Sequence, residues 1–125
     1  MIKNLPKKCK VVIIGGGVAG CSVAYHLAKY GWKDTVLLER DQLTSGTTWH
    51  AAGLVGQLRS SRNTTLMLKR SVAMYDRLEA ETGLAFDWKK VGSLRLAATK
   101  ERLLEARRLT TMARSFDLEM EIISP

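Results

Sequence analysis

The sequence predicts an α/β fold that opens with a βαβ unit. Residues 11–14, VVII, are a short β-branched run followed by glycines, which is typical of a strand in a parallel sheet with both faces buried. Residues 35–39, TVLLE, are a second such run, and apolar residues at helical spacing lie between the two. A strand, a helix and a strand in this order indicate a βαβ unit with a right-handed crossover.

The helix of this unit is expected over residues 18–30. Val23, Ala24 and Leu27 recur there at the spacing of one helical face. Gly31 follows directly, and a glycine at that place supplies the left-handed conformation in which many helices end. The helix should therefore stop before the second strand begins.

The later elements alternate between helices and strands. A polar, glycine-bearing connection over residues 44–63 is long enough to be a functional loop. Helices are expected over residues 64–82 and 100–115, where apolar residues follow one face. Alternation of apolar and polar residues predicts half-buried strands at 91–99 and 118–122.

Composition places the chain among ordinary folded proteins. Of its 125 residues, 46% are hydrophobic and 26% are charged, which argues against disorder. The formal net charge is +8, but the basic residues are scattered and interrupted by acidic ones. We therefore expect solvated faces and attraction for anionic ligands rather than a nucleic-acid site.

Signals for metals, membranes and targeting are absent from the sequence. Cys9 and Cys21 have neither metal-ligand nor CxxC spacing, which indicates reduced thiols of a cytosolic-type protein and no metal site. No apolar run approaches the ~20 residues of a membrane span. The basic head, residues 1–10, is too short as it stands for a signal or transit peptide. We expect a cytoplasmic location, or the mitochondrial matrix in a eukaryote.

The strongest chemical signal is the run GGGVAG at residues 15–20. Gly15, Gly17 and Gly20 form a G-x-G-x-x-G pattern between a strand and a helix. The first glycine allows the tight turn, the second lets the backbone approach a pyrophosphate, and the third lets the helix lie close to the sheet. The pyrophosphate then meets the free N–H groups at the positive end of the helix. This context predicts a Rossmann-type dinucleotide-binding unit.

Glu39 closes the second strand about 20 residues after the last glycine of the motif. A carboxylate there accepts hydrogen bonds from the hydroxyls of an adenosine ribose and repels a 2′-phosphate. The adjacent Arg40 could pair with such a phosphate, so a phosphorylated ribose is not excluded. The motif itself does not distinguish FAD from NAD. The chain beyond Glu39 turns back along the cofactor, and the hydroxyls it offers there favour the ribityl chain of FAD; they belong to Thr44, Ser45, Thr47 and Thr48.

Three segments, GGGVAG, LLER and LTSGTTWHAAGL, together resemble the FAD-dependent amine-oxidising, D-amino-acid-oxidase-like family that includes sarcosine dehydrogenase and dimethylglycine dehydrogenase. YHLAKYG, LEAETG and GSLRLA are also similar to family segments, so the resemblance covers most of the chain. QLR at residues 57–59 leans toward the sarcosine enzyme. The resemblance implies oxidation of the N-methyl C–N bond of a methylated amino acid to an imine, with reduction of FAD.

The resemblance assigns a role to His50. In the dehydrogenases of this family the histidine of the TWH segment is bonded covalently to the 8α carbon of the flavin, so His50 is the expected attachment point. The alternative is a loop histidine that contacts flavin without a bond. Trp49 packs against either the cofactor or the sheet. Substrate-binding and catalytic residues belong to a later part of the family fold, and none is identified within residues 1–125.

Partners follow from the same resemblance. Electrons would leave through an electron-transfer flavoprotein, and the one-carbon unit would be lost as formaldehyde or passed to tetrahydrofolate in a C-terminal domain. Two alternatives stay open. One is a non-catalytic protein resembling the regulatory subunit of pyruvate dehydrogenase phosphatase, which lacks the TWH histidine; the other is an amino-acid oxidase with noncovalent FAD. His50 favours an enzyme over the regulatory protein.

The change of strand pattern near residue 85 marks the expected domain boundary. Residues 1–84 are assigned to the N-terminal part of an FAD-binding domain, and residues 85–125 to the beginning of an α+β substrate domain. Two clear parallel strands leave hydrophobic sheet edges uncovered. We therefore expect the chain to be the N-terminal fragment of a longer protein.

Overall fold

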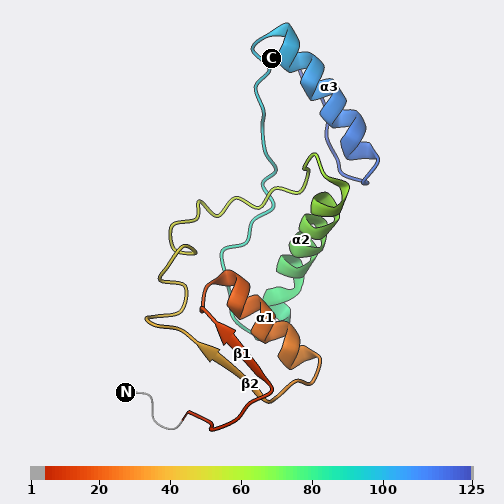
Figure 1. Cartoon of the computed structure of the whole chain (residues 1–125). Coiled ribbons are helices and arrows are strands. Elements are labelled where there is room, and N and C mark those ends of the chain that lie inside the picture. Colours follow the sequence, from red (N-terminus) through yellow and green to blue (C-terminus); the bar gives the residue numbers. More distant parts are fainter. Residues whose placement is uncertain (1–4, 125) are drawn as a thin grey trace. The chain divides into compact units, whose positions relative to one another are not determined.

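A computed structural model describes residues 5–124 of the chain. The elements follow in the order β1 (Val11–Ile14), α1 (Val18–Lys29), β2 (Thr35–Leu38), α2 (Arg62–Thr82) and α3 (Lys100–Arg114) (Figure 1). The chain divides into two compact units, Met1–Leu54 and Val55–Pro125. This division lies ahead of residue 85, and the assignment of residues 1–84 and 85–125 to two domains stays a prediction.

The first unit is the predicted βαβ arrangement. β1 and β2 pair in parallel, in a register that runs from Val11 opposite Thr35 to Ile14 opposite Leu38. The N–H of Gly15 donates to the carbonyl of Leu38 at 2.8 Å. Backbone pairing therefore reaches the start of the GGGVAG run at residues 15–20, here called the glycine turn. α1 connects the two strands and packs on both of them (Figure 1). The parallel order brings the carboxyl ends of both strands to one edge, where the glycine turn and Glu39 begin.

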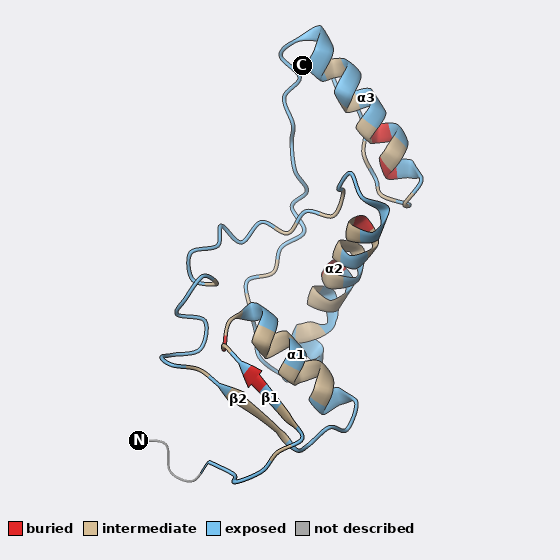
Figure 2. Cartoon of the chain, viewed as in Figure 1, coloured by how far each residue is buried: buried red, intermediate tan, exposed pale blue. Residues whose placement is uncertain are grey.

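Only one face of this strand pair is covered by an element of the first unit. Ile13 is 8% exposed, because it lies under α1, whereas its neighbours Val12 and Ile14 are 52% and 87% exposed (Figure 2). Successive side chains of a strand point to opposite faces. The prediction that both faces are buried is therefore wrong for the described residues, which supply a single covering layer.

α1 ends as the sequence predicts. Gly31 has a φ of +83°, its N–H donates to the carbonyl of Ala28 at 2.9 Å, and the N–H of Trp32 donates to the carbonyl of Leu27 at 2.9 Å. This pair of hydrogen bonds around a left-handed residue satisfies carbonyls of the last turn that would otherwise lack a donor. The helix stops at Lys29, one residue before the predicted end.

α2 and α3 belong to the second unit and are each capped by a hydroxyl. The side chain of Ser61 accepts the N–H of Thr64, which starts α2 two residues before the predicted position, and Gly83 ends it with a φ of +70°. The side chain of Thr99 accepts the N–H of Arg102 at 3.3 Å and starts α3 at the predicted residue. Both caps supply an acceptor to first-turn N–H groups that have no partner within the helix. No helix within residues 5–124 is both long and apolar enough to cross a bilayer.

Aromatic side chains hold the chain after α2 against that helix. Tyr75 stacks on Trp88 with ring centroids 5.1 Å apart and lies 6.0 Å from the ring of Phe86. The indole Nε1 of Trp88 donates to Asp76 at 2.9 Å, and Lys90 forms an ion pair with the same carboxylate at 2.6 Å. The Lys90 ammonium and then the Trp88 N–H lower the pKa of Asp76 below its usual value. Tyr75 therefore packs against the chain of its own unit.

The two later strands that alternation predicts do not form. Residues 91–99 and 118–122 adopt no regular secondary structure, and Leu94 and Leu96, expected on a buried face, are 74% and 81% exposed. Within the part of the chain that the structure describes, neither segment makes ladder hydrogen bonds to a neighbouring strand. Alternation of apolar and polar residues indicates side chains that suit one face of a sheet. A strand forms only where a neighbouring strand also takes up its backbone N–H and C=O groups in hydrogen bonds.

Candidate cofactor-binding site

The glycine turn between β1 and α1 has the geometry that the G-x-G-x-x-G pattern predicts. Gly15 has a φ of +101°, in the region that favours glycine. A Cβ on Gly20 would lie 1.9 Å from the carbonyl oxygen of Gly15 and 3.4 Å from Cγ2 of Ile13. Gly15 thus permits the turn, and Gly20 lets α1 lie against the strand.

Two further contacts of this turn were not evident from the pattern. A Cβ on Gly17 would lie 3.0 Å from the hydroxyl oxygen of Thr48, so this glycine makes room for a side chain of the following loop. Gly16 is buried, and a Cβ there would lie 2.5 Å from Cδ2 of Leu43. Gly16 and Gly17 therefore make room for the side chains of Leu43 and Thr48.

Backbone donors are available where α1 begins. In the described part of the chain, the N–H groups of Gly17, Ala19 and Gly20 have no hydrogen-bond acceptor. α1 also has no acidic residue in its first turn. Free N–H groups at the positive end of a helix bind anions. This arrangement fits the diphosphate of a dinucleotide.

Glu39 lies directly beside the glycine turn. Its Oε2 accepts the N–H of Gly16 at 2.6 Å, and its Oε1 accepts the N–H groups of Arg40 and Asp41 at 2.7 and 3.1 Å. The Gly16 N–H, followed by that of Asp41, lowers the pKa of Glu39, so the carboxylate is ionised near neutral pH. Sequence reasoning assigned Glu39 to a ribose and did not anticipate these backbone bonds. A carboxylate oxygen can accept more than one hydrogen bond, and Oε2 accepts one, from Gly16, so a ribose hydroxyl is compatible with the site.

Residues 41–50 form a series of turns, here called the His50 turn. The N–H of Thr44 donates to the carbonyl of Gly16 at 2.9 Å, and the N–H of Val18 donates to Oγ1 of Thr48 at 2.9 Å. Thr44 has a φ of +66°, which is unusual for a β-branched residue. The His50 turn is therefore joined to the glycine turn at two points.

His50 lies at the end of this turn with an exposed side chain. Its Nδ1 is 3.0 Å from the carbonyl oxygen of Gly46. A carbonyl only accepts, so Nδ1 carries the proton and Nε2 of the neutral ring keeps its lone pair. Trp49 is 78% exposed. The second histidine, His26, is half-buried in α1 and its Nδ1 donates to the carbonyl of Ser22 at 2.7 Å.

The predicted site residues divide into two groups. Gly15, Gly17, Gly20, Glu39 and Thr48 lie around the start of α1 and contact the glycine turn or form it. The side chains of the others are exposed, and in the described structure they make no hydrogen bond to the glycine turn; they belong to Arg40, Thr47 and His50.

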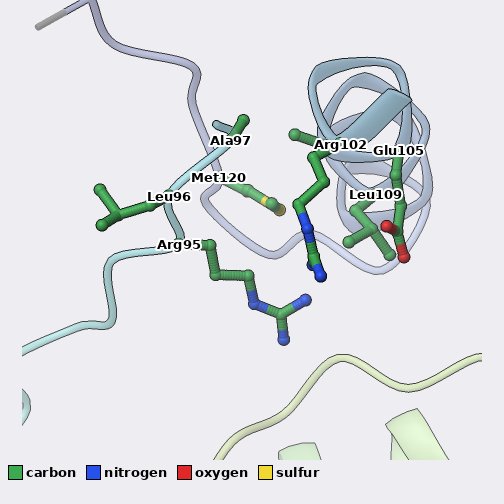
Figure 3. Close-up of a pocket in the computed structure, with 8 residues that line it drawn as sticks. Arg95, Leu96, Ala97, Arg102, Glu105, Leu109 and Met120 are labelled. Carbon is green, nitrogen blue, oxygen red and sulfur yellow. The ribbon is translucent and has the colours of Figure 1, made fainter. Parts of the chain in front are cut away.

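A separate open pocket lies in the second unit, beside α3 (Figure 3). Arg102 and Glu105 of α3 line it together with Arg95 and Met120 of the irregular segments. Figure 3 shows the Met120 side chain between the segment of Leu96 and Ala97 and the Arg102 side chain of α3, with Leu96 turned away. None of the predicted site residues lies in this pocket, and nothing in the sequence pattern singles it out.

Comparison with known proteins identifies a family. The family described as "DAO: FAD dependent oxidoreductase" matches residues 10–125. Mitochondrial sarcosine dehydrogenase of Homo sapiens is 46% identical over 98% of this chain, and mitochondrial dimethylglycine dehydrogenase of Rattus norvegicus is 45% identical over 94%. The mitochondrial regulatory subunit of pyruvate dehydrogenase phosphatase of Mus musculus is 42% identical over 97%.

These relatives are much longer than the chain, which spans 14% of the length of each of the three. Among solved structures, the L-amino acid deaminase of Proteus vulgaris superposes on 97% of this chain and 28% of its own with a TM-score of 0.83 and 18% sequence identity. That likeness supports the fold predicted from the sequence, an α/β unit of the Rossmann type.

Proposed function

We propose that this chain, which belongs to the family of FAD dependent oxidoreductases, forms the FAD-binding part of an enzyme that oxidises the N-methyl C–N bond of a methylated amino acid to an imine. The substrate is of the sarcosine or dimethylglycine type. Bound FAD would supply the acceptor for a hydride equivalent from the methyl carbon, and the amine nitrogen would lose a proton, which together give the imine. The names and identities of the two dehydrogenases support this substrate class.

One observation carries the proposal. The glycine turn leaves three backbone N–H groups unpaired in the described structure at the start of α1, beside the ionised Glu39. The N–H groups of Gly17, Ala19 and Gly20 would hold the diphosphate of FAD, and Glu39 would hold its adenosine ribose. The His50 turn, joined to the same glycine turn, supplies the segment for the flavin end.

We assign covalent attachment of the flavin to Nε2 of His50. The Gly46 carbonyl holds the proton of the ring on Nδ1, and Nε2 therefore retains the lone pair that would bond to the 8α carbon of the flavin. That carbon and the ring would each lose a proton, and the electron acceptor of the enzyme would take the two electrons that are released. The exposed position of the ring leaves this nitrogen accessible. A covalent bond retains the cofactor permanently, and redox chemistry stays with the flavin.

The attachment is tested on the full-length protein. Wild-type protein denatured in acid and separated on a gel should show flavin fluorescence on its band, and His50→Ala should abolish it. His26→Ala is the matched control, since it removes the other histidine of residues 1–125 and should keep the fluorescence. Covalent flavin that survives His50→Ala contradicts the assignment. Noncovalent FAD in the wild type supports the amino-acid oxidase alternative if amines are oxidised, and the non-catalytic regulatory alternative if none is.

The substrate and the electron acceptor need a separate experiment. We propose that the one-carbon unit is released as formaldehyde or passes to tetrahydrofolate bound elsewhere in the protein, and that an electron-transfer flavoprotein accepts the electrons. The location would be the cytoplasm, or the mitochondrial matrix in a eukaryote. Turnover of a panel of N-methyl amino acids with an artificial acceptor tests the substrate class. Faster oxidation of amino acids without an N-methyl group contradicts it.

A further inference from the structure

α1 begins without a cap of its own. Its N-cap residue is Gly17, which has no side chain to accept a first-turn N–H. The acceptor comes from Thr48, 30 residues later in the chain, whose Oγ1 lies 2.9 Å from the N–H of Val18. An N-cap serine or threonine usually accepts the N–H of the second or third helical residue, whereas Thr48 accepts that of the first, Val18. In both cases a hydroxyl satisfies a first-turn N–H that has no partner within the helix.

We propose that Thr48 is a positioning residue that fixes the His50 turn to the start of α1. The inference rests on the proposed function only for its effect on the flavin. The hydroxyl of Thr48 already accepts a backbone N–H, so its first task is structural. At the start of α1, the hydroxyl of Thr48 accepts the N–H of Val18. In the described structure the N–H groups of Gly17, Ala19 and Gly20 stay free to bind an anion.

The glycine turn is shaped to receive this hydroxyl. A Cβ on Gly17 would approach Oγ1 of Thr48 to 3.0 Å, which is closer than such atoms usually come. Gly17 therefore accommodates Thr48 as well as a pyrophosphate. The second connection, from the N–H of Thr44 to the carbonyl of Gly16, involves backbone atoms only, so any residue other than proline at position 44 can make it. Thr48 supplies the connection that depends on a side chain.

The connection has a consequence for His50, which follows Thr48 by two residues on the same turn. The free N–H groups that fit a diphosphate and the histidine that fits the flavin lie on different segments. The Val18–Thr48 hydrogen bond sets the position of one segment relative to the other. Loss of this bond should loosen the His50 turn and slow covalent attachment, because the ring is less often in the productive position.

The experiment compares variants of the full-length protein produced in riboflavin-limited cells and then given FAD. Thr48→Val removes the hydroxyl at nearly constant volume, and Thr48→Ser restores it. Thr99→Val is the matched control, because it removes the same type of cap from α3 in the other compact unit. The measurements are hydrogen exchange in peptides covering residues 41–50 and the initial rate of covalent flavin attachment.

Thr48→Val should speed exchange in residues 41–50 about fivefold, the equivalent of the ~1 kcal/mol that an N-cap hydroxyl contributes. The rate of flavin attachment should fall by about the same factor. Thr48→Ser should restore both, and Thr99→Val should change neither.

Unchanged exchange in Thr48→Val overturns the inference, and so does a Thr48→Ser variant that behaves like Thr48→Val. Gly17→Ala is a second test for the case in which Thr48→Val does not fold. Its Cβ should displace the hydroxyl and speed exchange in residues 41–50, and an unchanged rate there also overturns the inference. A wild-type protein without covalent flavin defeats the proposed role of His50, while the exchange comparison still decides the role of Thr48.

Discussion

Gly20→Ala should destabilise the FAD-binding unit. Among the glycines whose φ is not positive, we expect alanine to cost the most at this position. The new Cβ would lie 1.9 Å from the carbonyl oxygen of Gly15 and 3.1 Å from its carbonyl carbon. Both are backbone atoms, so relief requires the glycine turn or α1 to move by about 1 Å. Overpacking of this kind costs about 3 kcal/mol at the upper end of its usual range.

The helical position of Gly20 offsets part of that cost, because alanine is favoured over glycine in a helix by about 1 kcal/mol. The net loss of unfolding free energy should therefore be about 2 kcal/mol. Urea unfolding of the full-length protein, followed by flavin fluorescence, measures it. Gly56→Ala is the control, since its Cβ would meet the guanidinium of Arg59, at 3.3 Å, which is the far end of a side chain rather than backbone. Equal urea midpoints for Gly20→Ala and the wild type would refute the packing argument.

Three further results are expected. Because the pKa of Glu39 is lowered on folding, its carboxylate stabilises the protein above its unfolded pKa, and this contribution is lost as pH falls through the lower folded pKa. The urea midpoint of wild type should therefore exceed that of Glu39→Gln near neutral pH and approach it below about pH 5; a constant difference contradicts the assignment. Tyr75→Ala removes the stack on Trp88 and should lower the unfolding free energy by about 1 kcal/mol beyond the loss of buried area. A double-mutant cycle with Trp88→Ala measures this term, and the absence of coupling between the two substitutions contradicts it. Residues 1–125 expressed alone should bind a hydrophobic dye and unfold without a sharp transition, because one face of the β1–β2 sheet is uncovered; a cooperative melt with stoichiometric FAD contradicts this.

Local signals in the sequence predicted the first unit well. The runs at residues 11–14 and 35–39, the helix between them and the left-handed Gly31 all depend on neighbours along the chain, and the structure confirms them. The glycine turn belongs to the same class, since a tight turn and a close approach restrict which residue fits. Helix ends shifted by one or two residues where a cap such as Ser61 decided the start.

Features that depend on distant residues were missed. Strands at 91–99 and 118–122 require partners, which alternation along one segment cannot supply. The hydrogen bond between Val18 and Thr48 joins residues 30 positions apart, and the bond from Gly16 to Glu39 joins residues 23 apart. Sequence reasoning identified Thr48 and Glu39 as polar groups facing a cofactor. It did not show that both first satisfy the backbone of the glycine turn.

The proposed attachment of the flavin to His50 can be measured directly. The most direct measurement is peptide mass spectrometry of the full-length protein after acid denaturation and proteolysis. The peptide containing Trp49 and His50 should carry the mass of the flavin, with fragment ions that place it on the histidine ring. An unmodified peptide, with all FAD recovered in the acid supernatant, would contradict it.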